Sequence, residues 1–333
     1  MSILDTLDDW NAVPPGPFNN MGKVFNAFAN GQGPQSLQTD WLRASGMYFT
    51  CPREFVLNYW KPIPSKKFDG SARMRMGCGT WWHSYMQNCV LGPLGILQGK
   101  WDTKINTDYW DILGPSFHPD PELALREIRA EHTTLTWTFA EDSLQDDSLR
   151  LTGHHDGIIS IDRFRWLEEN LNLVRKDLPQ ALKELHSIAP GKLMHLELKS
   201  LSLDGKAKWK TADDTPDYYK MQAVIYQHMT GYDSTMFMLA DRDQFKIHTV
   251  KYDYDEGWWK ETVRKARIIW EAIRDRTLPE SGMPCTSQNV SRAKKCVFKT
   301  PCWDDMDFEA WVDEQSAAQP NRKWLDLSKW EAP

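Results

Sequence analysis

The sequence lacks the features that mark membrane, secreted or motor proteins. No apolar run reaches the roughly 20 residues that a membrane-spanning helix needs. The acidic N-terminus has neither the basic start nor the apolar stretch of a signal peptide. No G-x-x-x-x-G-K-S/T motif is present, which argues against a built-in helicase motor. We therefore expect a cytoplasmic protein with no membrane partner, in the host cytoplasm if a phage encodes it, and any helicase or recombination partner would be a separate chain.

An overall excess of positive charge is also missing, because 40 Lys and Arg residues face 46 Asp and Glu residues, for a net charge of -6. This excludes a surface coated in basic patches. It does not exclude nucleic acid, since a local basic groove can coexist with an acidic total and a carboxylate site adds negative charge of its own. The 333 residues, 41% hydrophobic and 26% charged, are typical of a folded globular protein.

The chain divides into three regions by composition and periodicity. Residues 1–38, with the breakers Pro14-Pro15-Gly16-Pro17, predict a flexible N-terminal arm. Residues 39–305 predict the folded domain, with a helical insertion over 163–190 and a cysteine segment over 283–303, and residues 306–333 predict a polar tail. Periodicity within the domain predicts helices over 41–60 (with Pro52 starting or kinking a helix), 80–90, 216–230 and 254–276, and strands over 133–139, 150–162, 193–200, 235–240 and 245–252. This order predicts an α/β fold with a central mixed sheet flanked by helices.

Two predicted strands carry acidic residues. Side chains alternate along a strand, so Glu197 and Lys199 share one face while Leu196 and Leu198 point into the core. Taken alone, this pair is better explained as an ion pair at a strand end, since short acid-x-lysine matches are common. The preceding strand contains Asp156 between Gly153 and Gly157, and alone this would be a turn acid. Two such strands in order favour a shared site.

Carboxylates on neighbouring strands suit the hydrolysis of a phosphodiester. They can hold one or two hard divalent cations, which prefer oxygen ligands. Such a cation polarises the phosphate and lowers the pKa of bound water, while a neighbouring lysine offsets the developing negative charge. Asp156, Glu197 and Lys199 are therefore residue types that this chemistry needs.

Four motifs in order resemble those of the PD-(D/E)XK nuclease superfamily, in its RecB-like exonuclease branch. They are a G-x-x-x-H motif at residues 79–83, a G-x-x-D-G motif at 153–157, an E-x-K motif at 197–199 and a Q-x-x-x-Y motif at 222–226. Each motif alone is weakly specific, but the ordered set is more specific. The resemblance spans residues 79–226, and the flanking cysteines extend it to about 45–303.

The resemblance implies a restriction-endonuclease-like core and a role for each motif residue. His83, Asp156, Glu197 and the carbonyl of Leu198 would bind Mg²⁺ or Mn²⁺, and Lys199 would serve the attacking water. Gln222 and Tyr226, four residues apart on one helical face, would support the active site or hold DNA, although helix packing explains Tyr226 and Tyr218 equally well. An upstream acid, Glu127 or Glu131, is a further candidate ligand.

The same resemblance implies a DNA exonuclease for single strands or free ends, used in recombination, repair or phage DNA metabolism. Two alternatives stay open. One is a CRISPR-adaptation-type or RNA-directed nuclease, which shares these motifs. The other is a catalytically silent scaffold subunit that only binds DNA, against which the intact Asp156, Glu197 and Lys199 argue.

Four of the six cysteines resemble the arrangement in RecB-like nucleases that contain an iron–sulfur cluster. Those nucleases have one Cys before the histidine motif and three after Q-x-x-x-Y. Cys51, Cys285, Cys296 and Cys302 match this order. The gap between the second and third is wider here than the family has. A 4Fe–4S cluster is the first interpretation, ordinary thiols the second and zinc the third. Cys78 and Cys89 are expected to be packing residues. The cations Arg292, Lys294, Lys295 and Lys299 lie among the last three cysteines and suit either phosphate contact or a solvated loop.

Overall fold

The structure is a computed structural model that describes residues 40–63, 79–92, 96–98, 100–106, 134–140, 143–160, 193–201, 209, 211–241, 247–280, 282–303, 307–331 and 333. The predicted arm over 1–38, the whole insertion over 163–190, Cys78 and the candidate acids Glu127 and Glu131 lie outside these residues. The chain forms two units, one of residues 1–37 and 63–81 and one of 38–62 and 82–333. Within the first unit only residue 63 and residues 79–81, which are helical, are described.

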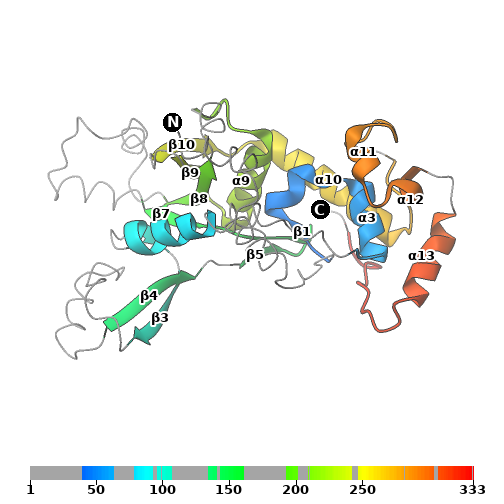
Figure 1. Ribbon diagram of the computed structural model, residues 1–333, viewed down its shortest axis with the longest axis horizontal. Helices are drawn as coiled ribbons and strands as arrows, with labels where there is room; N and C mark the ends of the chain where they lie inside the picture. The colour runs from blue at the N-terminus through cyan, green and yellow to red at the C-terminus, as the bar shows by residue number, and fades with distance from the viewer. Residues whose placement is uncertain are drawn as a thin grey trace, which may run out of the picture. The chain divides into compact units, whose positions relative to one another are not determined.

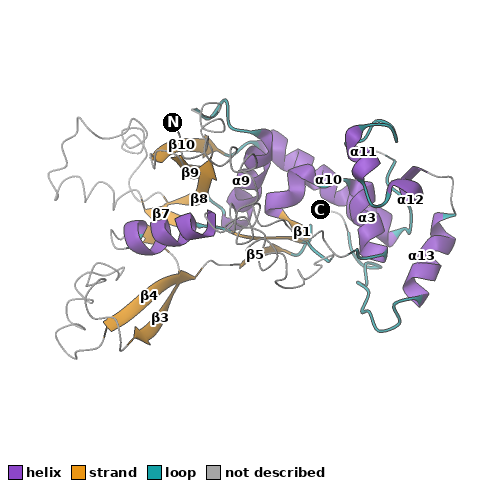
Figure 2. Ribbon diagram, viewed as in Figure 1, coloured by secondary structure: helices purple, strands orange, loops and turns teal. Residues whose placement is uncertain are grey.

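A five-stranded mixed sheet forms the centre of the second unit (Figures 1 and 2). Its strand order is β10 (Ile247–Asp253), β9 (Ser234–Asp241), β8 (Leu193–Leu201), β7 (Gly157–Ser160) and β2 (Leu97–Gln98). Only β8 and β9 are parallel, and the other neighbours are antiparallel. The expected mixed sheet is therefore present.

Helix α9 (Asp217–Thr230) connects the two parallel strands and covers one face of the sheet (Figure 1). It ends at Gly231, whose φ of 76° is accessible to glycine at little cost. Ala223 and Val224 of the helix pack against Phe237 of β9. The opposite face of the sheet buries a separate cluster, in which the apolar residues of β8 and β9 meet Trp82 and Met86. Both faces of β8 are thus covered, which explains why its polar residues are buried as well.

The predicted strand over 150–162 is wrong as one element, because it breaks at His155 and Asp156. Its first part, β6 (Leu151–His154), belongs to a three-stranded mixed sheet with β1 (Leu42–Arg43) and β5 (Ser143–Asp146). Its second part is β7 in the central sheet. Gly157 begins β7 with a φ of 142°, which side-chain-bearing residues rarely adopt. Asp156 therefore sits where the chain passes from one sheet to the other.

The helical prediction over 41–60 also needs correction. The chain forms a 3₁₀ helix, η1 (Ala44–Phe49), and then α3 (Pro52–Trp60), which starts at Pro52 because proline suits the first helical turn. The long helix α10 (Glu256–Arg274) is capped at its N-terminus by Asp255, whose side chain accepts hydrogen bonds from the N–H groups of Gly257 and Trp258. Trp270 of α10 is fully buried and donates its indole N–H to the Leu149 carbonyl at 2.7 Å. These helices pack on the three-stranded sheet in one apolar cluster.

The histidine helix predicted over 80–90 is helical throughout. Residues 82–85 are helical and continue as the π-helix η2 (Met86–Leu91). Of the expected apolar stripe, Trp82 and Met86 are buried, whereas Trp81 and Tyr85 are 58% and 42% exposed. A further pair of strands, β3 (Lys100–Asn106) and β4 (Thr134–Ala140), forms an antiparallel ribbon.

The C-terminal region is not merely a polar tail. After the short helices α11 (Ser291–Lys295) and α12 (Lys299–Trp303), the chain forms α13 (Phe308–Ala317). Val312 of α13 and the later Leu327 are buried in the same apolar cluster as Trp270. The part of the chain that the structure describes contains no helix that is both long and apolar enough to cross a membrane.

Candidate active site

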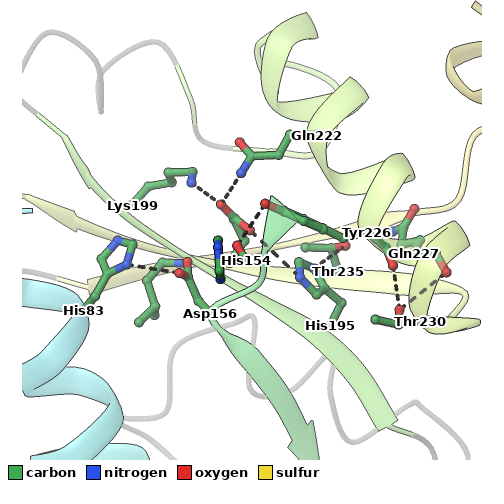
Figure 3. Close-up of polar contacts among 12 residues, drawn as sticks. His83, His154, Asp156, His195, Lys199, Gln222, Tyr226, Gln227, Thr230 and Thr235 are labelled. Carbon is green, nitrogen blue, oxygen red and sulfur yellow. Dashed lines mark hydrogen bonds and ion pairs between the residues drawn. The ribbon is translucent and has the colours of Figure 1, made fainter. Parts of the chain in front are cut away.

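Three side chains of helix α9 contact the polar face of β8, and two of them, Gln222 and Tyr226, are seen in Figure 3. His195, Glu197 and Lys199 point to this face because strand side chains alternate, as predicted for the last two. The Tyr226 ring lies 5.0 Å from the His195 ring. The Gln222 amide donates to Glu197 Oε1 at 2.7 Å. The Tyr219 ring lies 5.2 Å from Lys199 Nζ, in a cation–π contact.

Asp156 reaches the same place from the break between β6 and β7 (Figure 3). Its Oδ2 accepts the backbone N–H of Leu198 at 2.6 Å, and its own carbonyl accepts the Gln87 amide at 2.9 Å. Its Oδ1 lies 3.1 Å from His83 Nδ1. The predicted residues Asp156, His83 and Glu197 are therefore brought together, with Leu198 linked through its N–H. The Leu198 carbonyl stays a predicted ligand.

The charges of Asp156 and His83 stabilise one another. Burial would raise the pKa of Asp156, but the hydrogen bond from His83 and the positive charges nearby outweigh it and hold this pKa below its ordinary value. Burial likewise acts to lower the pKa of His83, and the Asp156 carboxylate more than offsets it, so that this pKa is raised. Asp156 is thus a carboxylate at neutral pH.

The second pair, Glu197 and Lys199, is in direct contact on β8. Burial raises the pKa of Glu197 to about 7, in spite of the opposing effect of Lys199. Burial works against the charge of Lys199, but Glu197 and Asp156 hold its pKa above the ordinary value. The two carboxyl groups therefore have separated pKa values, an arrangement that is common where ionisable groups do chemistry.

One carboxylate oxygen in this site lacks a hydrogen bond. Glu197 Oε2 is buried without a hydrogen-bond partner, 4.0 Å from His195 Nε2, which also has none. His195 cannot supply a charge, because burial and the neighbouring His155 lower its pKa to about 3. A buried carboxylate oxygen without a partner costs free energy that a cation would recover. Two carboxylates with a histidine beside them fit a hard divalent cation.

Among the described residues, no group of three or more His, Cys, Asp or Glu side chains is arranged to hold a metal ion. This includes His83, Asp156 and Glu197, which are all described. The fit to a cation consequently rests on the chemistry of the donors and on the unsatisfied Glu197 oxygen. The metal itself remains a prediction.

Tyr226 supports the loop that carries Asp156. Its hydroxyl donates to the His154 carbonyl at 2.9 Å, and its ring lies against Gly153. A Cβ atom at Gly153 would lie 2.6 Å from the Tyr226 ring, which explains the glycine at this position. Tyr226 therefore packs against Gly153 and also supports the loop that carries Asp156. Tyr218, four residues before Gln222, contacts Phe49 and Tyr219 instead of the carboxylates.

Four residues at the site were not predicted from the sequence. His195 lies two positions before Glu197 on the same strand face, and Gln87 lies one helical turn after His83. Strand and helix periodicity could have found both. Tyr219 and Thr235, whose hydroxyl lies 3.2 Å from His195 Nδ1, depend on how α9 and β9 pack, for which the sequence gives no signal.

The four predicted cluster cysteines line one small cavity: Cys51, Cys285, Cys296 and Cys302. All four are free thiols, and burial raises the pKa of Cys51 and Cys296. Arg53 joins the two segments that supply them, since it donates to the Pro279 and Cys302 carbonyls, each at 2.6 Å. The side chain of Cys89 lies outside the described residues, as does Cys78. The structure therefore gathers the four thiols without showing what they hold.

Comparisons with known proteins give no family for the chain. No protein-family model matches it, and no curated protein matches it either. One solved structure with which it aligns is the crystal structure of SSO0001, at 12% sequence identity and a TM-score of 0.32 over 88% of this chain and 98% of that one. A similarity this low carries no argument about fold or function.

Replacing Gly153 with alanine should destabilise the protein and displace Tyr226. The added methyl group meets the tyrosine ring, and overpacking of this kind costs about 1–3 kcal/mol. The free energy of unfolding from urea titration measures it. Gly46→Ala is the matched control, because nothing lies within 4 Å of a Cβ there. Equal stability of Gly153→Ala and the parent protein would show that Tyr226 does not lie against this glycine.

Proposed function

We propose that the chain is a PD-(D/E)XK nuclease of the RecB-like branch, a Mg²⁺- or Mn²⁺-dependent DNA exonuclease that acts on single strands or DNA ends. The observation that carries the proposal is the meeting of Asp156, Glu197, Lys199 and His83, which come from three separate segments. Their order along the chain is the order of the four motifs. The mixed sheet with helices on both faces agrees with such a core.

In this proposal the protein prepares two carboxylates for a cation. The Leu198 N–H engages Asp156 Oδ2, and the Gln222 amide engages Glu197 Oε1, so each carboxylate has one oxygen fixed. The other oxygens, Asp156 Oδ1 beside His83 and Glu197 Oε2, would hold the metal. When bound, Mg²⁺ or Mn²⁺ supplies Lewis-acid polarisation of the phosphate and an acidified water.

Lys199 is the charged donor of the site. Its ammonium lies between the Glu197 carboxylate and the face of the Tyr219 ring, which fixes the side chain and maintains its charge. A fixed positive charge beside the scissile phosphate stabilises the negative charge that develops during hydrolysis. The Lys199 ammonium would also position an attacking water by donating a hydrogen bond to it. The intact lysine distinguishes this proposal from a silent DNA-binding scaffold, while an RNA-directed or CRISPR-adaptation-type nuclease would use the same residues.

We further propose that Cys51, Cys285, Cys296 and Cys302 hold a 4Fe–4S cluster, with zinc as the alternative metal. The support is that one cavity is lined by all four thiols, although they come from two segments far apart in the sequence. Four thiolates are the ligand set for either metal. A bound metal would join the start of α3 to the C-terminal segment and close a long loop, which reduces the entropy of the unfolded chain.

The nuclease proposal is tested with end-labelled single- and double-stranded DNA in Mg²⁺, Mn²⁺ or EDTA. The parent protein should degrade DNA only with the cation, and Glu197→Ala should lower the rate by about a hundredfold or more. Glu256→Ala, at an acid whose side chain is 59% exposed, is the matched control and should be fully active. Equal rates for parent and Glu197→Ala would refute the site, and binding without cleavage by either protein would favour the scaffold.

Cation affinity should fall as the pH falls through 7. A proton and the cation compete for the Glu197 carboxylate, whose pKa is about 7, so the ionised fraction decreases below this pH. The raised pKa of His83 adds to the same trend. Calorimetric titration with Mn²⁺ should give a dissociation constant about tenfold weaker at pH 6 than at pH 8. An affinity that does not change between these values would contradict cation binding at Glu197.

Protein expressed anaerobically with ample iron should be brown and contain iron. Iron analysis and the visible absorption spectrum measure the cluster, and Cys302→Ser should lose most of both. Cys89→Ser is the control, because the predicted cluster set does not include Cys89. Colourless parent protein with neither iron nor zinc would eliminate this metal site and leave four ordinary thiols.

A further inference from the structure

Two large aromatic side chains lie exposed at the end of η1. Phe49 is 52% exposed and Tyr48 is 37% exposed, and their rings meet edge to face at 5.2 Å. Exposed neighbouring aromatics are costly to hydrate, so a protein that keeps them in a fixed place commonly uses them for binding. The active-site proposal makes no use of either residue.

The backbone beneath these rings is held by two cations. Lys265 of α10, buried, donates to the Met47 and Tyr48 carbonyls at 3.0 and 2.7 Å. Arg292 of α11 donates to the Phe49 carbonyl at 2.7 Å. Three successive carbonyls are therefore tied to other helices. The exposed rings thus stand on a fixed support and lose little further entropy when a ligand binds.

The exposed pair continues into a row of aromatic rings that ends at the candidate active site. The Phe49 and Tyr48 rings lie 5.3 and 6.3 Å from the Tyr218 ring. Tyr218 lies 4.2 Å from Tyr219, and Tyr219 faces Lys199. We call Tyr48, Phe49 and Tyr218 the aromatic row. It connects the exposed surface to the residue that contacts the catalytic lysine.

We propose that the aromatic row binds the unpaired bases of a nucleic-acid strand whose backbone is cleaved beside Lys199. This inference rests on the proposed nuclease function and names the part of the substrate that the protein contacts outside the reaction centre. Bases of any sequence stack on aromatic rings, whereas a duplex hides its base faces. The row therefore selects unpaired strands without selecting sequence.

Positive charge adjoins the row at Arg292, whose guanidinium also lies 3.6 Å from Glu54 Oε2. Arg292, which holds Phe49, belongs to α11, and the same helix carries the exposed Lys294 and Lys295. Alternating aromatic and cationic groups are typical of surfaces that bind single strands, because rings take the bases and cations take the phosphates. A second copy of the chain or an apolar protein partner would have no use for this charge, so we assign the row to nucleic acid.

The test measures binding without cleavage. Full-length Glu197→Gln protein in EDTA is titrated into a labelled 12-nucleotide oligothymidine, into the same backbone with abasic sites and into a blunt duplex, with fluorescence anisotropy as the readout. Adding Phe49→Leu, which keeps an apolar side chain but removes the ring, should weaken oligothymidine binding about fivefold or more. It should not change binding of the abasic strand. Phe49→Trp should restore the affinity, because tryptophan also stacks.

The matched control is Ile247→Leu at a side chain that is 41% exposed on β10, and it should not alter either affinity. Circular dichroism confirms that each variant is folded. If Phe49→Leu binds oligothymidine within twofold of the parent, or loses the abasic strand to the same extent, the inference is overturned. Sedimentation shows whether the row instead joins two copies: a dimer that dissociates in Phe49→Leu with unchanged DNA affinity would also overturn it.

These outcomes are distinct from failure of the nuclease proposal. A protein that cleaves DNA but binds oligothymidine equally well with and without the Phe49 ring keeps its proposed function and loses only the inference. Base-dependent binding that requires Phe49, in a protein that never cleaves, supports the aromatic row and refutes the nuclease.

Discussion

The packing of α9 against the polar face of β8 is the constraint on which the candidate site depends. A strand in the centre of a sheet covered on both faces would ordinarily carry apolar residues, yet His195, Glu197 and Lys199 are on β8. Burying these groups is tolerable only when each has a partner. Tyr226, Gln222 and Tyr219 of α9 supply one partner each, at successive turns of one helix. Glu197 Oε2 and His195 Nε2 are the buried side-chain atoms of these three β8 residues that remain without a hydrogen bond, and a cation beside Oε2 would complete the arrangement.

The second requirement is that an acid from another segment of the chain reaches the polar face of β8 without passing through the apolar core. The chain achieves this by leaving the three-stranded sheet after β6 and entering the central sheet at β7. Gly157 permits the turn through its φ of 142°, and Gly153 leaves room for the Tyr226 ring that supports the loop. Both glycines of the G-x-x-D-G motif are thus explained by backbone conformation and close packing, and the position of Asp156 follows from them.

Local periodicity was sufficient to predict much of this. Alternation along residues 193–200 placed Glu197 and Lys199 on one face opposite Leu196 and Leu198, and the structure confirms it. The predicted order of strands and helices gave the mixed sheet. What failed was set by tertiary structure. The break before Gly157 depends on the separate sheets that β6 and β7 join, which the alternation along residues 150–162 does not specify, and the burial of Val312 depends on a surface that other helices make. Tyr219, not Tyr218, meets Lys199 because the angle between α9 and β8 decides which side of the helix faces the strand.

The start of the described chain serves two of the proposed sites at once. Tyr48 and Phe49 of the aromatic row lie just before Cys51, and one residue separates Phe49 from it. Arg292 lines the cysteine cavity and also donates to the Phe49 carbonyl. A metal bound by the four thiols would fix Cys51 relative to the segment that carries Arg292, and would thereby restrain the support beneath the exposed rings. In the proposal, the cysteine cavity would then contribute to strand binding through the backbone, without touching the strand or the carboxylates. Such a division would let the four thiols lie in the same unit as the proposed hydrolytic site, whose chemistry requires no electron transfer.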